Sequence, residues 1–227
     1  MEIKVSTLAE NTAGMGYLAE WGISMLIEAD GARILFDTGM GVAAVYNAEL
    51  MDIDLKTVDR IVISHGHHDH TGGLRDVLMR MKKDMEVIAH PDIWALKYSR
   101  WRKRPEQYGG MPFRRELLEN LGARFNLTRQ PVRITDRILT TGEIPMLTEY
   151  EEIDSGLFDK KNGEMIPDEM ADDLAMIIDT EYGLVVILGC AHRGMVNTLK
   201  HAQKLTGKEL IYAAIGGTHL VNASRER

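Results

Sequence analysis

The stretch Ser64-His65-Gly66-His67-His68-Asp69-His70 holds four histidines and one aspartate within seven residues. Arg60-Ile61-Val62-Ile63 precedes it and is apolar after its first residue, the pattern of a strand that is buried on both faces. Thr71-Gly72-Gly73 follows it, and the apolar residues of 74–81 then recur at the spacing of one helix face. We therefore predict a buried strand, a histidine loop and an amphipathic helix, in this order.

The residue types in this loop indicate a metal site. Gly66 permits a tight turn that directs His65 and His67 at one point, where imidazole nitrogens bind zinc at roughly 2.0 to 2.1 Å. Asp69 and His70 follow closely enough to serve a second ion. A histidine-rich surface loop is the competing interpretation, but clustered imidazoles repel one another when charged. We predict one or two divalent ions, zinc first, with manganese, iron or magnesium as alternatives, and Asp69 as a catalytic residue.

Length and composition predict one globular domain over residues 1–227, with 44% hydrophobic and 27% charged residues. No apolar run is long enough to span a bilayer, and Met1-Glu2-Ile3-Lys4-Val5 lacks the features of a secretory signal, so we expect a soluble, cytoplasmic protein without a membrane partner. Cys190 is the only cysteine, which excludes an internal disulfide and a four-cysteine zinc site. The net charge of −7 disfavours nucleic acid as a partner. The sequence does not predict an oligomeric state.

Apolar periodicity predicts an α/β fold with a two-sheet core covered by helices. Asp30-Gly31 between two apolar runs predicts a hairpin, and Phe36-Asp37-Thr38-Gly39 ends its second strand with a carboxylate. The expected strands cover residues 3–8, 24–28, 33–36, 60–64, 85–89, 174–179, 184–188 and 210–215. The expected helices cover residues 42–51, 74–81, 113–121 and 195–205.

Residues 91–137 are predicted to form a helical, basic insertion, because they hold eleven Lys and Arg against five Asp and Glu. Within it, Trp101 and Arg102-Lys103-Arg104 are candidate binding residues for an anionic substrate, and a solvated helical face is the alternative. Trp94 and Tyr98 are interpreted, together with Trp101, as an anchor for the insertion. The alternative is an aromatic lid that stacks on a flat ring.

The motif His65-x-His67-x-Asp69-His70 followed by Thr71-Gly72-Gly73 resembles the signature of the metallo-β-lactamase superfamily. Phe36-Asp37-Thr38-Gly39 is similar to the strand that precedes the metal loop in that superfamily. The resemblance extends over nearly the whole chain. It implies a four-layer αββα sandwich with a one- or two-metal site at one edge.

Four further segments narrow the resemblance: Glu20-Trp21-Gly22-Ile23-Ser24, Thr141-Gly142-Glu143-Ile144-Pro145, residues 189–197 and Gly216-Gly217-Thr218-His219-Leu220. They resemble one branch of the superfamily, the dihydropterin-6-ylmethyl-ribofuranosylaminobenzene phosphate synthases of methanopterin biosynthesis. The resemblance implies condensation of a dihydropterin diphosphate with ribofuranosylaminobenzene phosphate and loss of pyrophosphate.

The remaining metal ligands depart from the superfamily pattern, since Gly189-Cys190 stands where many superfamily hydrolases have a Gly-Asp pair. We predict His192 as the third imidazole and His219 as a further site residue. Cys190 is a candidate thiolate bridge between two ions, although a small buried core residue is the alternative. Asp173 is a candidate carboxylate ligand, with an ordinary solvated acid as the alternative.

Three histidines are expected outside the set of metal ligands. His68 is predicted to point away from the ions, or to orient a neighbouring ligand. His90 precedes Pro91 at a strand end and is expected to have a structural role. His201 is expected to be exposed on a helix.

The sequence alone is compatible with three functions. The first is the pterin condensation, and the second is hydrolysis of a phosphodiester, lactone or thioester by the metal centre. Relatives are expected to continue past residue 227 with a further ligand segment, so the chain is predicted to be truncated. The third function, a non-catalytic metal sensor, follows from such an incomplete ligand set.

Overall fold

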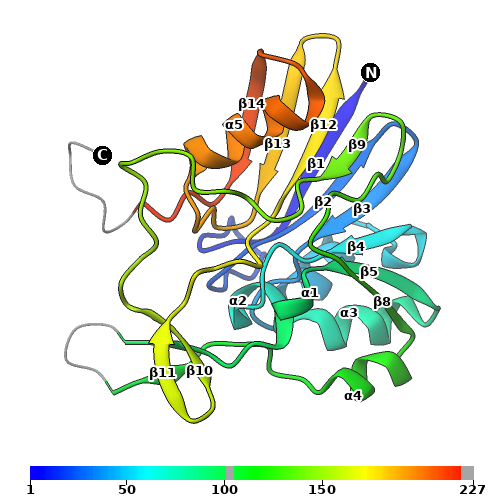
Figure 1. Cartoon of the computed structure of the whole chain (residues 1–227). Helices are drawn as coiled ribbons and strands as arrows, with labels where there is room; N and C mark the ends of the chain where they lie inside the picture. Colours follow the sequence, from blue (N-terminus) through cyan, green and yellow to red (C-terminus); the bar gives the residue numbers. More distant parts are fainter. Residues whose placement is uncertain (101–104, 221–227) are drawn as a thin grey trace.

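Two β-sheets lie face to face in the computed structural model, which describes residues 1–100 and 105–220 (Figure 1). In the larger sheet the spatial order is β1, β2, β3, β4, β5, β8. The first three strands pair antiparallel, whereas β3, β4, β5 and β8 pair parallel. The bounds are β1 (Ile3–Ala9), β2 (Ser24–Ala29), β3 (Ala32–Phe36), β4 (Arg60–Val62), β5 (Met85–Ala89) and β8 (Ala123–Leu127).

The second sheet has the spatial order β14, β13, β12, β9. β12 pairs antiparallel with both β9 and β13, and β14 pairs parallel with β13. The helix α5 (Met195–Thr206) connects the two parallel strands, as a parallel pair requires. The bounds are β9 (Ile138–Thr140), β12 (Ala175–Thr180), β13 (Gly183–Leu188) and β14 (Ile211–Gly216).

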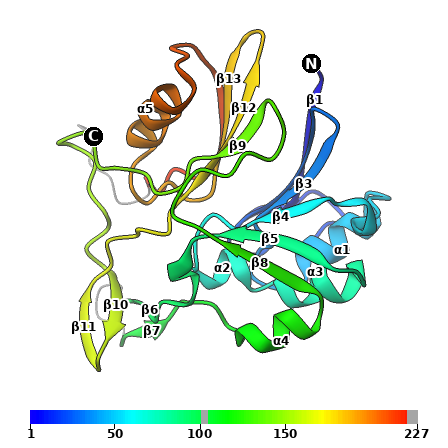
Figure 2. The same cartoon turned by 45° about the vertical axis from the view of Figure 1, so that its right-hand side comes forward.

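Helices cover the outer faces of both sheets, which produces four layers (Figures 1 and 2). The helices α1 (Ala43–Leu50), α3 (Leu74–Met81) and α4 (Arg115–Asn120) pack on the larger sheet, and α5 packs on the second. A separate apolar cluster, with Phe36 from one sheet and Met176 from the other, fills the space between them. This arrangement confirms the αββα sandwich. Among the described residues, no helix combines the length and the apolarity that crossing a bilayer requires.

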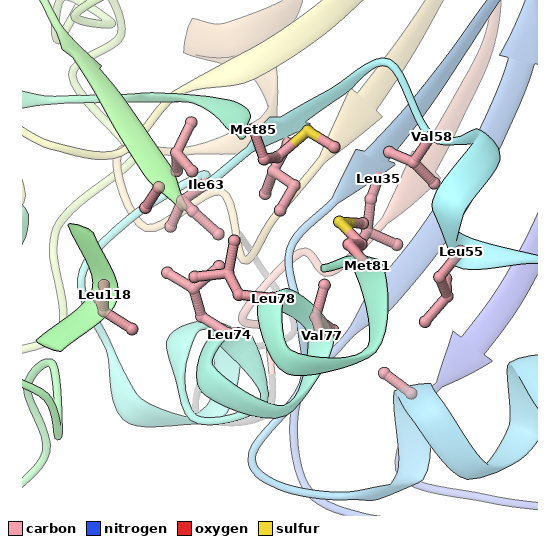
Figure 3. Packing of buried hydrophobic residues seen from close by; sticks show 14 of the residues in the cluster. Leu35, Leu55, Val58, Ile63, Leu74, Val77, Leu78, Met81, Met85 and Leu118 are labelled. Atoms are coloured by element: carbon pink, nitrogen blue, oxygen red, sulfur yellow. The ribbon is translucent and has the colours of Figure 1, made fainter. Parts of the chain in front are cut away.

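The packing of α3 confirms the helix predicted directly after the histidine loop (Figure 3). Leu74, Val77, Leu78 and Met81 are at most 1% exposed and lie against Leu35 of β3 and against Ile63, the residue after β4. Burial of this face stabilises the helix and thereby fixes the chain that leaves the loop. The Asp30-Gly31 hairpin is also confirmed, because both residues have the positive φ that such a turn requires, 50° and 74°.

The prediction of a helical insertion over residues 91–137 is wrong for its first half. Pro91–Trp94 forms a single 3₁₀ turn (η2), and β6 (Lys97–Ser99) and β7 (Gln107–Tyr108) follow. Tyr98 pairs with Phe158 of β10 and with Tyr108 of β7, so long-range strand pairing overrides the local helical pattern. In the second half α4 is helical as predicted, but β8 belongs to the larger sheet.

A third, small sheet was not predicted. Its spatial order is β11, β10, β6, β7, with β10 (Leu157–Lys161) and β11 (Glu164–Pro167) joined by a turn at Asn162-Gly163. Both turn residues have positive φ, 53° and 88°. The sequence signal was present, since Asn-Gly between two short runs favours a hairpin. The turn of this hairpin therefore consists of these two residues.

The close approach of the two sheets at Gly189 gives a testable prediction. A Cβ atom on Gly189, directly after β13, would overlap the buried side chain of Ser64, directly after β4. Gly189→Ala should therefore lower the free energy of unfolding by about 1 to 3 kcal/mol, measured by urea denaturation. Gly109→Ala is the control, because a Cβ at Gly109 meets nothing within 4 Å. Equal stability of the two variants would contradict this account of the sheet contact.

Candidate metal centre

The candidate ligands gather at one edge of the sandwich, at the carboxyl ends of β4, β13 and β14. His65 and His67 lie in the loop after β4, and Asp69 and His70 lie in the short helix α2 (His68–Thr71). The segment after β13 supplies Cys190 and His192, and the segment after β14 supplies His219. The parallel strands β13 and β14 end at the same edge of the second sheet, and the end of β4 in the larger sheet lies close to that edge, since a Cβ on Gly189 would overlap Ser64. Residues that are far apart in the sequence therefore meet there.

Four imidazoles lie side by side in this place. The ring centroids of His65, His67 and His192 form a triangle with sides of 4.7, 4.8 and 4.9 Å. The ring of His219 lies 4.3 Å from that of His192. The structure thus brings together the histidines that the sequence predicted as ligands, although they come from three segments.

The burial of these rings fits a bound cation. His65 and His192 are 1% and 5% exposed, and neither Nε2 of His65 nor either ring nitrogen of His192 has a hydrogen-bond partner among the described residues. Such orphaned buried nitrogens cost free energy unless something binds them. Burial, together with the charges of neighbouring groups, holds the pKa of His65, His67 and His192 well below the usual range. Neutral imidazoles with free lone pairs are what a divalent metal requires.

One buried carboxylate orients the ring of His65 through a serine. Asp37 Oδ1 accepts from Ser64 N at 2.7 Å, and Asp37 Oδ2 accepts from Ser64 Oγ at 2.6 Å. The Ser64 oxygen lies 2.8 Å from Nδ1 of His65. Since the serine hydrogen points to the carboxylate, His65 donates from Nδ1, and its unpaired Nε2 carries the lone pair.

The same carboxylate orients His70. Asp37 Oδ2 lies 2.6 Å from Nδ1 of His70, which leaves Nε2 directed at Cys190 Sγ, 3.1 Å away, and at Asp69 Oδ2, 3.5 Å away. Burial lowers the pKa of His70, but the charges of Cys190, Asp69 and Asp37 outweigh it and raise that pKa well above the usual value. Burial raises the pKa of the Cys190 thiol, and His70 opposes that increase. A cation between these groups replaces the proton that they otherwise share.

Asp37 and Ser64 have roles at this site that the sequence patterns did not reveal. The available signal was the position of Asp37 at the end of a buried strand, directly before Thr38-Gly39. Its φ of 58° is unusual for a residue other than glycine, and its side chain is fully buried. A buried carboxylate in strained backbone at a strand end is typical of a functional site.

Cys190 belongs to both groups of side chains that could hold a metal. One group comprises His65, Cys190 and His192, the other comprises Asp69, His70 and Cys190, and in each the ligand atoms lie within 4.8 Å of one another. A thiolate shared by two groups suits a pair of ions. The alternative of Cys190 as a small core residue is therefore disfavoured by its position between charged and imidazole groups.

Asp173 lies at the same edge and is buried rather than solvated. Its Oδ2 accepts from Arg193 N at 2.8 Å, whereas its Oδ1 has no hydrogen-bond partner among the described residues. Burial, reinforced by the charge of Asp172, raises the pKa of Asp173 to about 7. An orphaned carboxylate oxygen next to the imidazole cluster keeps Asp173 a candidate ligand.

A cavity with a volume of about 850 Å³ lies at this edge, and its lining includes six of the candidate ligands: His67, Asp69, His70, Cys190, His192 and His219. Its described lining contains no lysine and no arginine. The aromatic and large apolar residues of its walls are Trp21, Ile23, Met40, Tyr98, Tyr108, Leu157 and Leu220. The cavity therefore offers aromatic and apolar side chains next to a polar site, which suits a ring-shaped ligand.

The predicted site residues of the 91–137 segment do not all lie at the cavity. Trp101 and Arg102-Lys103-Arg104 lie outside the described residues, in the connection between β6 and β7. Trp94 is an anchor, as predicted, because its indole donates to Phe113 O at 3.1 Å and its ring packs edge-on against Phe125. Tyr98, in contrast, lines the cavity.

The remaining histidines lie outside both ligand groups. His90 has the predicted structural role, with Nε2 2.8 Å from Glu143 Oε1. His68 lines the cavity and is half-buried. The exposure predicted for His201 is wrong, since its half-buried ring reaches across to Thr141 O at 3.1 Å. The helix periodicity alone did not reveal this contact with the neighbouring loop.

Comparisons with known proteins agree with this geometry. A family model described as the metallo-β-lactamase superfamily matches residues 23–198. The chain is 36% identical to the 7,8-dihydropterin-6-methyl-4-(β-D-ribofuranosyl)-aminobenzene-5'-phosphate synthase of Methanocaldococcus jannaschii, over 99% of the chain and 80% of that protein. An uncharacterized protein of the same organism is 32% identical over 97% of the chain and 80% of its own length.

Solved structures with a similar fold include a protein described as a member of the same superfamily. The crystal structure of Tm1679, described as a metal-dependent hydrolase of the β-lactamase superfamily, matches with a TM-score of 0.81 at 27% identity and covers 99% of this chain and 80% of that one. A quorum-quenching N-acyl homoserine lactone lactonase matches with a TM-score of 0.50 at 15% identity, over 89% of this chain and 82% of that one, which supports the fold alone.

A named synthase and a metal-dependent hydrolase among the relatives support an enzyme over a non-catalytic sensor. The fold itself implies binding of divalent metal. The family match over residues 23–198 and the identity along 99% of its length show that the chain belongs to the metallo-β-lactamase superfamily.

Proposed function

We propose that the chain is a metal-dependent synthase that joins a dihydropterin to ribofuranosylaminobenzene 5'-phosphate. The observation that carries this proposal is that two ligand groups share Cys190, and that Asp69, His70, Cys190 and His192 of these groups line a cavity with aromatic walls. The 36% identity to the Methanocaldococcus synthase suggests the substrate pair. A ligating thiol must be reduced, which agrees with a cytoplasmic location.

The ligand assignment follows from the two groups. His65, His192 and Cys190 would hold one ion, and Asp69, His70 and Cys190 would hold the other. The ring of His67, packed against His65 and His192, completes the first set, and Asp173 and His219 lie beside it as further candidates. Imidazole and thiolate ligands favour zinc, with manganese or iron as alternatives. When bound, these ions supply positive charge that stabilises the negative charge of a departing phosphate group.

The proposed reaction forms one bond and breaks one. The amine nitrogen of the aminobenzene attacks the methylene carbon attached to the pterin ring, and the bond from this carbon to the diphosphate oxygen breaks. Pyrophosphate leaves with the electron pair of that bond. The attacking nitrogen loses a proton, and Asp69, which lines the cavity, is the candidate acceptor.

The walls of the cavity bind and orient the substrate rings in this proposal. Trp21 and the pair of Tyr98 and Tyr108, whose ring centroids lie 5.5 Å apart, offer aromatic faces and edges to a pterin. The absence of lysine and arginine from the described lining suits an uncharged ring. The anionic phosphate groups then depend on the ions and on Arg102-Lys103-Arg104 for recognition.

Metal-dependent hydrolysis of a phosphodiester, lactone or thioester is the second candidate. The similarity to the hydrolase Tm1679, at 27% identity, favours it. The same ligands serve either reaction, and the difference lies in whether water or an amine attacks. The cavity walls favour the condensation, because enclosing two ring substrates excludes water from the reacting carbon.

A direct assay separates the two reactions. Zinc-loaded protein incubated with the dihydropterin diphosphate and ribofuranosylaminobenzene phosphate should release pyrophosphate and form the condensed product, measured by mass spectrometry. Asp69→Asn should lower the rate by at least about 100-fold, because it loses both a ligand and the proton acceptor. Hydrolysis of an ester or phosphodiester without any condensed product would favour the second candidate instead.

The assignment of Cys190 as a ligand has a spectroscopic test. Protein loaded with Co²⁺ in place of zinc should show a sulfur-to-cobalt charge-transfer band in the near ultraviolet, and Cys190→Ser should lack it. Because the chain contains one cysteine, this band has a single possible protein thiolate as its source. A wild-type spectrum without the band, at full cobalt occupancy, would rule out the thiolate ligand.

Trp21 provides a test of the aromatic wall. Trp21→Ala should raise the dissociation constant for a dihydropterin about fivefold or more, since stacking on an aromatic side chain contributes about 1 to 3 kcal/mol. Tyr182→Ala is the matched control, because Tyr182 and Trp21 are both 62% exposed and Tyr182 lies at the opposite end of β13 from Gly189. Unchanged affinity in Trp21→Ala, measured by calorimetry, would exclude Trp21 from ring binding.

A further inference from the structure

A buried lysine lies beside the metal centre and takes no part in the proposed reaction. Lys97 of β6 is 1% exposed, and its ammonium donates to Asp168 Oδ2 and Asp172 Oδ1, both at 2.8 Å. The two aspartates are 5% and 1% exposed. Buried charges are expensive unless they are paired and hydrogen-bonded, so this cluster is a defined structure rather than a chance contact.

The cluster has a second connection, to the backbone of the histidine loop. Asp172 Oδ2 accepts from Gly66 N at 2.7 Å, and Gly66 lies between His65 and His67. On another side of Gly66, a Cβ atom would overlap Ile93 O, so the loop is confined there by the backbone of η2. The peptide group between two candidate ligands is thus fixed by one carboxylate and by close packing.

The two aspartates of the cluster have different neighbours. Asp168 Oδ1 accepts from Met170 N at 2.7 Å, within its own turn. Asp172 alone of the two contacts the histidine loop, and Leu174 N adds a second link to that loop by donating to Ser64 O at 2.9 Å. If the cluster only stabilised the fold, either aspartate would serve the purpose equally.

We propose that Asp172, held in place by Lys97, is a positioning residue that fixes the Gly66 peptide so that His65 and His67 face the metal. Neither Asp172 nor Lys97 is a candidate ligand. The pair sets the metal affinity through the orientation of the loop, in the way that outer hydrogen bonds commonly tune metal sites. The inference rests on the proposed metal centre, but it does not depend on the identity of the substrate.

Zinc affinity tests this role in two single-site variants. Asp172→Ala should weaken Zn²⁺ binding about 10- to 100-fold, measured by competition with a chromophoric chelator. Asp168→Ala is the matched control, because it removes a carboxylate from the same lysine and leaves the Gly66 hydrogen bond in place. Its zinc affinity should stay within about threefold of wild type. Asp172→Asn, which retains an oxygen for Gly66 N–H, should recover part of the loss.

Equal losses of zinc affinity in Asp172→Ala and Asp168→Ala would overturn the proposal, since they would indicate general destabilisation. Unchanged affinity in Asp172→Ala would overturn it as well. A measurement on the wild-type chain remains decisive where Asp172→Ala fails to fold. The Gly66 amide should be protected from hydrogen exchange about 100-fold or more in metal-free protein, because it donates to Asp172. Exchange at the rate of an open loop would contradict this hydrogen bond and the positioning role that depends on it.

The failure of this proposal is distinguishable from a failure of the proposed function. Loss of the condensation activity with intact zinc affinity concerns the substrates and leaves the positioning role standing. A wild-type chain without measurable zinc affinity would refute the metal centre and the positioning role together.

Discussion

The buried carboxylate of Asp37 is the contact on which the rest of the site depends. It accepts hydrogen bonds from the backbone and hydroxyl of Ser64 and lies 2.6 Å from Nδ1 of His70, so one side chain fixes the start of the histidine loop and its last ligand. The core supports this arrangement, since Asp37 N donates to Val62 O and thereby ties β3 to β4. A fully buried carboxylate without these partners would be strongly destabilising. The fold and the orientation of the ligands are therefore held by the same hydrogen bonds.

The second constraint is the contact between the ends of the two sheets. Gly189 follows β13 and lies so close to Ser64 that no side chain fits, which brings Cys190 to His70 and His192 to His65. Each sheet thus supplies half of the ligands. A metal at this position links the two halves of the sandwich, so metal binding and the stability of this edge are expected to depend on each other.

Local sequence patterns predicted much of the fold and placed the first four candidate ligands in one loop. The strand, histidine loop and α3 follow from hydrophobic periodicity within one segment, and the four-layer sandwich follows from the motif. Contacts between distant segments could not be predicted from local patterns. Tyr98 pairs with Phe158, and because of this pairing the segment forms β6 instead of the predicted helix. The cluster of Lys97, Asp168 and Asp172 could not be predicted for the same reason, since the two aspartates lie more than 70 residues from the lysine in the sequence. The role of Cys190 was left between two alternatives, a metal ligand and a core residue, because burial alone does not distinguish them.

The proposed metal centre has two ions that share the Cys190 thiolate at the edge of the sandwich. A crystal structure of the zinc-loaded protein, with anomalous scattering at the zinc absorption edge, decides whether these ions are present. We expect two anomalous peaks, each at about 2.3 Å from Cys190 Sγ, with His65 and His192 at one and Asp69 and His70 at the other. A single peak, or two peaks bound by histidines and carboxylates with the sulfur outside bonding distance, would contradict it.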